Sequence, residues 1–168
     1  GANLAEMTSI GIPVPQGFII TTEACVHYSR AGEYPEGLAQ EIEAHLAHLE
    51  EVTGKTLGDS SNPLLLSVRS GSVFSMPGMM DTILNLGLND ATVEGLVAST
   101  GNARFAYDSY RRFINMFGEV VMGVDAQLSE DALTEKKAEL GVELDTDLSA
   151  EDLKDVTDRY KILLRKKR

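Results

Sequence analysis

The chain has 168 residues, 43% of them hydrophobic, which predicts one globular domain or two small lobes rather than a disordered chain. No apolar run reaches the roughly 18–20 residues of a transmembrane helix, and a formal net charge of -11 argues against nucleic-acid binding. The single cysteine, Cys25, and the lack of a signal-peptide pattern predict a cytoplasmic protein with neither an internal disulfide nor a membrane partner.

The first 88 residues are expected to mix helices with short strands. Helices are predicted at 2–9, 22–30 and 37–52. The third helix has the clearest signal, because Leu38, Ile42, Leu46 and Leu49 recur at spacings of three and four residues. Strands are predicted at 18–21, 64–68 and 82–86. This alternation favours an α+β arrangement in which helices pack on a small sheet.

Every convincing segment after residue 88 is helical, so the sequence predicts a division into 1–88, an α/β part, and 89–168, a helical subdomain. Helices are predicted at 90–99, from 102 onward, at 129–140 and at 149–164. The helix that starts at Asn102 is rich in aromatic residues at helical spacing, which predicts core packing rather than stacking on a nucleotide base. The pair Arg111 and Arg112 is expected on solvated faces or in ion pairs.

The segment 67–82 is the most informative part of the sequence. A buried strand is expected to deliver Arg69 to a flexible Ser-Gly-Ser loop. A guanidinium is always charged and offers a fork of donors, and glycine lets backbone N–H groups approach an anion. The pattern therefore fits phosphate binding by Arg69. It fits equally well an arginine that is neutralised by a nearby carboxylate beside an ordinary loop.

The motif SVRSGSVFSMPGMMDTILNLGLND at 67–90 resembles the signature of the pyruvate phosphate dikinase family. Three more segments resemble the same family in the same order: GANLAEMTSIGIPVPQGFIITTEAC at 1–25, NARFAYDSYRRFINMFGEVVM at 102–122 and LDTDLSAEDLKD at 144–155. The resemblance therefore covers nearly the whole chain. Phosphoenolpyruvate synthases share the VRS element, but SMPGMMDT is more characteristic of the dikinases.

The resemblance implies that the chain is part of an ATP-grasp nucleotide-binding domain with an inserted helical subdomain, within a larger protein. In the family, a Gly-Gly-Lys whose lysine contacts ATP precedes the position of Gly1. The second ATP-grasp half, which carries the magnesium ligands, would follow later, as would a histidine-bearing carrier domain. The implied partners are ATP, Mg²⁺ and that carrier domain, and the parent protein is expected to be a homodimer, whereas this chain alone is expected to be monomeric.

The implied reaction converts ATP, phosphate and pyruvate to AMP, pyrophosphate and phosphoenolpyruvate through a phosphohistidine. By resemblance, Arg69 contacts ATP and is the expected catalytic residue, and 75–82 belongs to a mobile segment that closes over the phosphates. The expected nucleotide-binding set is Arg69, Ser70, Gly71, Ser75, Met76, Gly78, Met79, Asp81 and Thr82. Asp81 could position a metal-bound water or accept backbone N–H groups, and we expect the structural role; no metal ligand is predicted within the chain.

Other functions remain open from the sequence alone. The chain could be a phosphoenolpyruvate synthase-like dikinase domain, a noncatalytic nucleotide-sensing or interaction module, or a helical docking domain built on the aromatic-rich helix. Retention of Arg69 and of the whole SMPGMMDT element argues against the last two.

Overall fold

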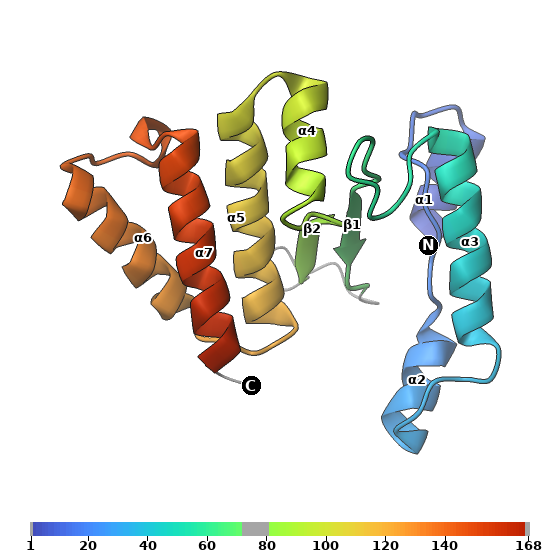
Figure 1. Ribbon diagram of the computed structural model, residues 1–168. Coiled ribbons are helices and arrows are strands. Elements are labelled where there is room, and N and C mark those ends of the chain that lie inside the picture. Colours follow the sequence, from blue (N-terminus) through green and yellow to red (C-terminus); the bar gives the residue numbers. More distant parts are fainter. Residues whose placement is uncertain (1, 72–80, 167–168) are drawn as a thin grey trace. The chain divides into compact units, whose positions relative to one another are not determined.

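In the computed structural model, the chain is described over residues 2–71 and 81–166 and divides into two compact units, Gly1–Gly54 and Lys55–Arg168 (Figure 1). The sequence predicts a different division, at residues 88–89, between an α/β part and a helical subdomain. That division stays a prediction. Within the described residues, no helix has both the length and the apolar character that crossing a membrane requires.

The first unit is built from three helices and their connections. They are α1 (Ala2–Ser9), α2 (Thr22–Ala31) and α3 (Leu38–Thr53). All three confirm the predicted helices to within two residues. The strand predicted at 18–21 is wrong, because a strand needs a neighbour to pair with and no described segment pairs with these residues. Among the described residues of the first unit, Leu49 is the one hydrophobic residue that is buried. The hydrophobic core of this unit is therefore small.

The second unit combines a two-stranded antiparallel sheet with a group of helices. Its elements are β1 (Leu66–Arg69), β2 (Thr82–Leu86), α4 (Thr92–Thr100), α5 (Ala103–Val120), α6 (Ala126–Leu140), a 3₁₀ turn η1 (Asp145–Asp147) and α7 (Ala150–Lys166). The predicted α+β class is confirmed at this level. The β2 prediction has the observed bounds, whereas β1 begins two residues later than predicted.

Helix α5 is the centre of the second unit, since it packs against α7, α4 and β2, while α6 packs mainly on α7 (Figure 1). Its start is fixed by Asn102, whose side chain accepts a hydrogen bond from the Phe105 N–H. The aromatic side chains Tyr107, Tyr110 and Phe113 are buried, which confirms their predicted core role. Phe105 differs, being 50% exposed.

Helix α7 supplies the most deeply buried part of this core. Leu153, Val156 and Tyr160 recur at spacings of three and four, and all are at most 2% exposed. This stripe faces α5 and α6, as an amphipathic helix requires. The hydrophobic core therefore lies between α5 and α7 and extends to β2 through Ile83.

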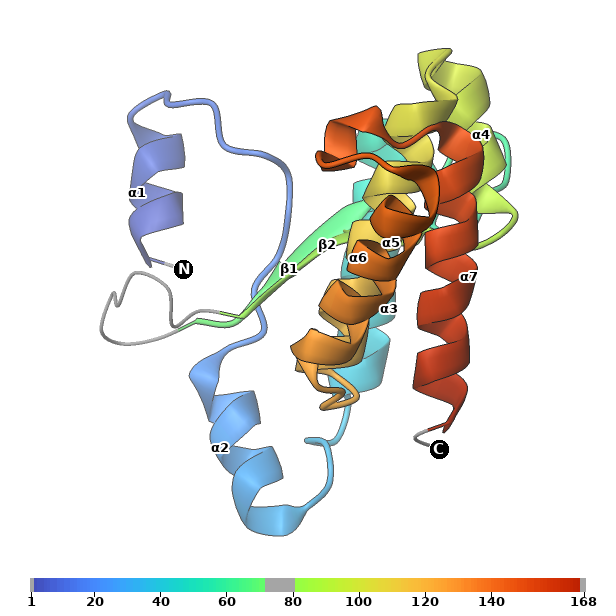
Figure 2. The same ribbon diagram turned by 90° about the vertical axis from the view of Figure 1, so that its left-hand side faces the viewer.

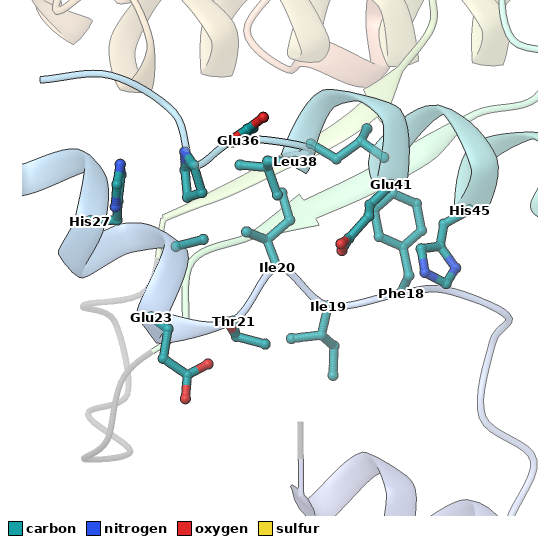
Figure 3. Close-up of a pocket in the computed structure, with 13 residues that line it drawn as sticks. Phe18, Ile19, Ile20, Thr21, Glu23, His27, Glu36, Leu38, Glu41 and His45 are labelled. Carbon is teal, nitrogen blue, oxygen red and sulfur yellow. The ribbon is translucent and has the colours of Figure 1, made fainter. Parts of the chain in front are cut away.

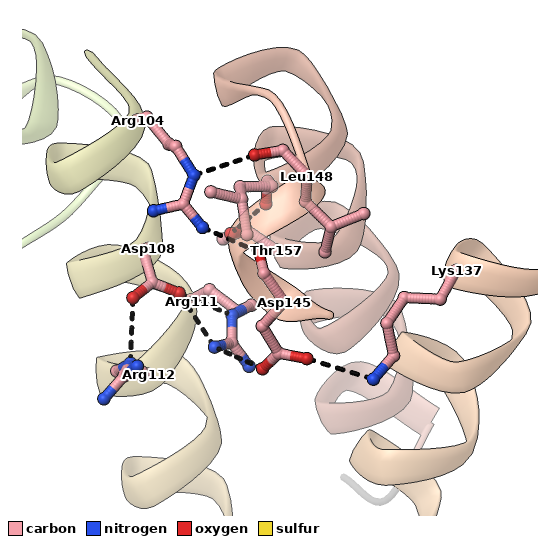
Figure 4. A network of polar contacts seen from close by, with 9 residues as sticks. Arg104, Asp108, Arg111, Arg112, Lys137, Asp145, Leu148 and Thr157 are labelled. Atoms are coloured by element: carbon pink, nitrogen blue, oxygen red, sulfur yellow. Dashed lines mark hydrogen bonds and ion pairs between the residues drawn. The ribbon is translucent and has the colours of Figure 1, made fainter. Parts of the chain in front are cut away.

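A polar network joins α5 to the connection between α6 and α7 (Figure 4). The side chain of Arg104 donates to the backbone carbonyls of Asp145 and Leu148, at 2.6 and 2.9 Å. Arg111 donates to Asp108 and lies 3.5 Å from Asp145. The ion-pair alternative predicted for Arg111 is thus confirmed, but the side chain is also buried, which the sequence did not indicate.

Candidate functional site

The β1–β2 pair brings the two ends of the 67–82 motif together. Arg69 lies directly opposite Thr82 in the antiparallel register. Beyond that pair, the Ser70 N–H donates to the Asp81 carbonyl at 2.9 Å, so the pairing continues past the last residue of β1. Figure 2 shows the two strands side by side, projecting from the helices of the second unit. We call this end of the pair the strand-pair end; it comprises Arg69, Ser70, Gly71, Asp81 and Thr82.

Arg69 is exposed, and its guanidinium makes no hydrogen bond or ion pair with any other described residue. The alternative of an arginine neutralised by a nearby carboxylate therefore finds no support in the described part of the chain. Because Arg69 and Thr82 are directly opposite, their side chains share one face of the strand pair. A guanidinium and a hydroxyl on one face offer donors to the same anion.

The burial of β1 differs from the sequence prediction. Leu64 before the strand is buried and Leu66 is half-buried, but Ser67, Val68 and Arg69 are exposed. The prediction of a buried strand up to residue 68 is therefore wrong for its distal half in this structure. The strand projects beyond the helices that cover its beginning, so only its first residues reach the core.

The other predicted nucleotide-binding residues separate into two groups. Ser70 and Asp81 already use backbone groups to join the two strands, and the Ser70 hydroxyl lies 3.3 Å from the same Asp81 carbonyl. The Asp81 side chain is exposed. The Asp81 backbone thus joins the two strands, whereas both roles considered for its carboxylate stay predictions. The remaining residues lie outside the described residues: Ser75, Met76, Gly78 and Met79.

Asn85 in β2 is a residue whose structural importance the sequence reasoning missed. Its φ angle is 59°, in the left-handed region, and it is the sole non-glycine residue with a positive φ in the described chain. The register changes beside it, because Leu66 pairs with Leu86 but Val68 pairs with Ile83. Two β2 residues therefore oppose one β1 residue, which defines a β-bulge. The available signal was an asparagine inside an apolar strand, a residue depleted in strands but tolerated in the left-handed region.

A separate groove of about 380 Å³ lies within the first unit, between α2, α3 and the segment 18–21 (Figure 3). Its apolar side includes Ile20 and Phe18, and the Phe18 ring stacks on His45 with the centroids 5.5 Å apart. Carboxylates surround it: Glu23, Glu36 and Glu41 all line the groove. This lining opposes phosphate binding, because like charges repel. The groove is therefore a poorer phosphate site than the strand-pair end.

Metal binding needs oxygen, nitrogen or sulfur ligands gathered at one point. No group of three or more His, Cys, Asp or Glu side chains suited to a metal occurs between residues 2 and 71 or between 81 and 166. At the strand-pair end, Asp81 is the carboxylate among the five residues that define it. Since Mg²⁺ prefers several oxygen ligands, this end supplies at most one protein carboxylate to such an ion.

The comparisons with known proteins agree with the motif. Residues 1–51 match the family model described as the AMP/ATP-binding domain of pyruvate phosphate dikinase. The chain is 55% identical over 161 residues to pyruvate, phosphate dikinase of Giardia intestinalis. It is 58% identical over 162 residues to the chloroplastic pyruvate, phosphate dikinase of Flaveria trinervia, and 55% identical over 162 residues to pyruvate, phosphate dikinase of Rhizobium meliloti.

Each of these alignments covers 96% of this chain but only 17–18% of the relative. The chain thus corresponds to a short segment of each dikinase, and the aligned segment extends well beyond the part that the family model matches. The similarity predicted from four sequence segments is confirmed. The chain is therefore similar along nearly its whole length to a segment of pyruvate, phosphate dikinases, and its residues 1–51 match the AMP/ATP-binding domain of that family.

Proposed function

We propose that the strand-pair end forms part of the nucleotide site of a pyruvate, phosphate dikinase and that Arg69 binds phosphates of ATP there. The observation that carries the proposal is the register of β1 and β2, which sets Arg69 opposite Thr82, with no ion pair from the Arg69 guanidinium to another described residue. The relatives whose alignments cover 96% of the chain are named as dikinases.

The chemistry of the strand-pair end suits a polyphosphate. Arg69 would donate to two phosphate oxygens at once through its planar fork, and the Thr82 hydroxyl would donate from the same face. Among the described residues, no atom beyond the chain neighbours of Gly71 lies within 4 Å of the position its Cβ would take, so these residues leave its backbone open to an anion. Phosphoryl transfer depends chiefly on positioning and on stabilising negative charge, and an arginine at this place provides both.

The whole reaction that we propose for the parent protein takes ATP, phosphate and pyruvate to AMP, pyrophosphate and phosphoenolpyruvate. A histidine of a separate carrier domain would take the β-phosphoryl group, and Mg²⁺ would neutralise charge on the nucleotide, with most of its ligands outside this segment. We further propose the ATP-grasp architecture with a helical insertion, a homodimeric parent protein and a cytoplasmic location. These proposals rest on the resemblance in sequence.

The first test is calorimetric titration of ATP, with and without Mg²⁺, into the chain and into Arg69→Ala. A charge-assisted hydrogen bond contributes about 1.5–3 kcal/mol, so the variant should bind about 10-fold or more weakly. Arg165→Ala is the matched control, because it removes the same charge from an exposed position at the end of α7. Equal affinity of the two variants would contradict the role of Arg69.

A second test measures turnover in a chimera, in which this chain replaces the aligned segment of one of the bacterial relatives. The identity of 55% over 96% of the chain makes such a replacement practicable. Arg69→Ala in the chimera should reduce turnover by about 100-fold or more, as loss of a group that stabilises transition-state charge does. Arg165→Ala should leave turnover unchanged. A folded chimera without activity would instead favour a noncatalytic nucleotide-binding module.

A further inference from the structure

The bulge at Asn85 lets Ile83 and Leu86, three positions apart in β2, face the same core. Ile83 is 8% exposed and belongs to the core, and Leu86 packs against the same core although it lies three positions later. In a regular strand, residues three apart point to opposite faces, because the side chains alternate. The extra residue of the bulge removes this conflict. Leu84, between them, is left 37% exposed.

The same extra residue determines what faces Arg69. The pair Leu66–Leu86 lies on the core side of the bulge, and the pair Arg69–Thr82 lies on the distal side. If the strands continued from Leu66–Leu86 without a bulge, Arg69 would lie opposite Ile83. A shift of one residue also turns the β2 side chains to the other face. Thr82 would then leave the face of Arg69.

The backbone at the strand-pair end depends on the same register. The Ser70 N–H reaches the Asp81 carbonyl at 2.9 Å in the distal register, one step beyond the Arg69–Thr82 pair. A register shifted by one residue would present the Thr82 carbonyl to Ser70 instead. The direction in which the chain continues from Gly71 would change with it. One backbone conformation in β2 therefore sets the geometry of the whole strand-pair end.

Asparagine is suited to this position for a specific reason. The left-handed region is sterically costly for most L-residues, and asparagine and glycine occupy it most readily. A β-branched residue at 85 would disfavour this conformation and favour regular strand pairing. The left-handed backbone at Asn85 and the register change beside it both indicate a β-bulge centred on this residue.

We propose that Asn85 is the positioning residue for Arg69: its left-handed backbone holds the β-bulge that sets Arg69 opposite Thr82. The significance of this position for ATP rests on the proposed function, whereas the control of register does not. Asn85 itself lies on the core side of the Arg69–Thr82 pair and acts through the backbone.

The test compares the full chain with Asn85→Val, Asn85→Gly and a deletion of Asn85. Asn85→Ala is a milder replacement if Asn85→Val does not fold, and Ile83→Val is the control that weakens the core without changing the register. The first readout is the strand register, measured without nucleotide from NMR contacts between the backbones of residues 69 and 82. The second is the ATP affinity measured by calorimetry, which a merely structural role would not move beyond the effect of Ile83→Val.

The expected result is that Asn85→Gly keeps the contacts between residues 69 and 82, whereas Asn85→Val replaces them with contacts between residues 69 and 83. The deletion should keep the 69–82 contacts, because without the extra residue regular pairing runs from Leu66–Leu86 to Arg69–Thr82. ATP affinity should fall by about 10-fold or more in Asn85→Val and stay unchanged in Asn85→Gly, the deletion and Ile83→Val. Retention of the 69–82 contacts in the folded Asn85→Val variant, or their loss in the folded deletion variant, would overturn the proposal. So would a shifted register with unchanged ATP affinity, if Arg69→Ala still loses affinity. If Arg69→Ala also binds ATP normally, the proposed function fails, while the NMR contacts still decide the role of Asn85.

Discussion

Arg111 in the middle of α5 and Asp145 in the connection before α7 lie 3.5 Å apart, although 34 residues separate them in the sequence. The Asp145 carboxylate also accepts from Lys137 of α6 at 3.0 Å, and its backbone carbonyl accepts from Arg104. One residue thereby contacts two helices through different atoms (Figure 4). Two hydrogen bonds to Asp108, at 3.1 and 2.8 Å, and a longer contact with Asp145 keep the buried guanidinium of Arg111 compensated.

Replacing Arg111 by methionine should destabilise the second unit. Methionine keeps much of the buried volume but leaves Asp108 and Asp145 without their shared cation, and breaking a buried ion pair in this way costs about 3–5 kcal/mol. We expect a loss near the lower end, about 3 kcal/mol, because Arg112 still lies 2.9 Å from Asp108. Urea denaturation of the wild-type chain and of Arg111→Met measures the difference.

The neighbouring arginine provides the control for that measurement. The Arg112 side chain is 61% exposed, and exposed ion pairs contribute about 0–1 kcal/mol. Arg112→Met should therefore change the free energy of unfolding by less than about 1 kcal/mol. Equal losses in the two variants would show that burial of Arg111 does not decide its contribution.

Acid should destabilise the contact between α6 and α7. Asp155 lies 3.0 Å from Lys136 and 3.0 Å from Arg159, and the hydrogen bond from Lys136 is the main reason why the pKa of Asp155 is lowered from its ordinary value of 3.8. A lowered pKa in the folded state contributes stability that is fully present above 3.8 and is lost as the pH falls through the folded pKa below it. Stability should therefore be nearly constant from pH 7 to about 5 and decline below about 4.

Lys136→Met identifies the source of that decline. Without the ammonium group, the pKa of Asp155 should rise toward its ordinary value, so the loss of stability between about pH 4 and 2 should become shallower. Denaturation curves at several pH values, for both proteins, make the comparison. Parallel curves across the acid range would mean that Lys136 does not hold the charge on Asp155.

Alkali should act on a tyrosine at the contact of α4 with α5. Tyr107 is 8% exposed and donates to Glu94 at 2.5 Å; burial, followed by the hydrogen bond to Glu94, raises its pKa from 10.0 to about 12. A raised pKa contributes stability that is present below 10 and is lost as the pH rises through about 12. Tyrosinate absorbance should thus show a late titration that disappears in Tyr107→Phe.

Glu94→Gln separates the two causes of this shift. Glutamine keeps an acceptor for the phenol but removes the negative charge, so the pKa of Tyr107 should lie between 10.0 and about 12, with burial still raising it. The same absorbance titration gives the answer. A pKa that stays at about 12 in Glu94→Gln would assign the shift to burial and the retained hydrogen bond, and none of it to the charge of Glu94.

Gly95 in α4 is packed too closely for a side chain. A Cβ at this position would lie 2.2 Å from the Ser60 carbonyl oxygen, which belongs to the backbone and has little freedom to move. Overpacking of this kind costs about 1–3 kcal/mol, which exceeds or offsets the roughly 1 kcal/mol that alanine contributes over glycine in a helix. Gly95→Ala should therefore lower the free energy of unfolding.

Gly118→Ala is the matched control, because Gly118 is also a buried glycine within a helix. Its Cβ would meet the Cδ2 atom of Leu164 at 2.5 Å, the end of a flexible side chain that can rotate away. Thermal unfolding should show a clearly larger loss for Gly95→Ala than for Gly118→Ala. Equal midpoints would indicate that the Ser60 loop moves as easily as the side chain of Leu164.

The helices were predictable because their signals are local. The start of α5 follows from Asn102, and the apolar spacing in α3 identifies its buried side. The start of α6 was placed at Ser129, but the helix begins at Ala126 after a cap by Asp125, and Ser129 is a buried residue within it. A serine near a helix start was thus mistaken for its cap, because the Asp125 signal lies only four residues earlier.

The strands and the site depended on contacts distant in sequence. The apolar segment 18–21 has strand propensity, yet propensity cannot supply a partner strand. The bulge at Asn85 arises because Ile83 and Leu86 must both reach one core, which becomes evident only when that core is known. Burial of Arg111 likewise required knowledge of Asp145. The family motif, by contrast, predicts a role for Arg69 without the fold, since a motif carries information about a site independently of the fold; that role stays a prediction.

The contacts of Asp145 have a practical consequence for engineering this chain. The connection between α6 and α7 resembles a good insertion point, since Leu144 is 62% exposed. Yet Asp145 fixes that connection at its middle through Arg104, Arg111 and Lys137. A tag or fluorescent reporter inserted beside Asp145 would separate these partners. The connection between α6 and α7 is therefore a poor insertion point, although it is exposed.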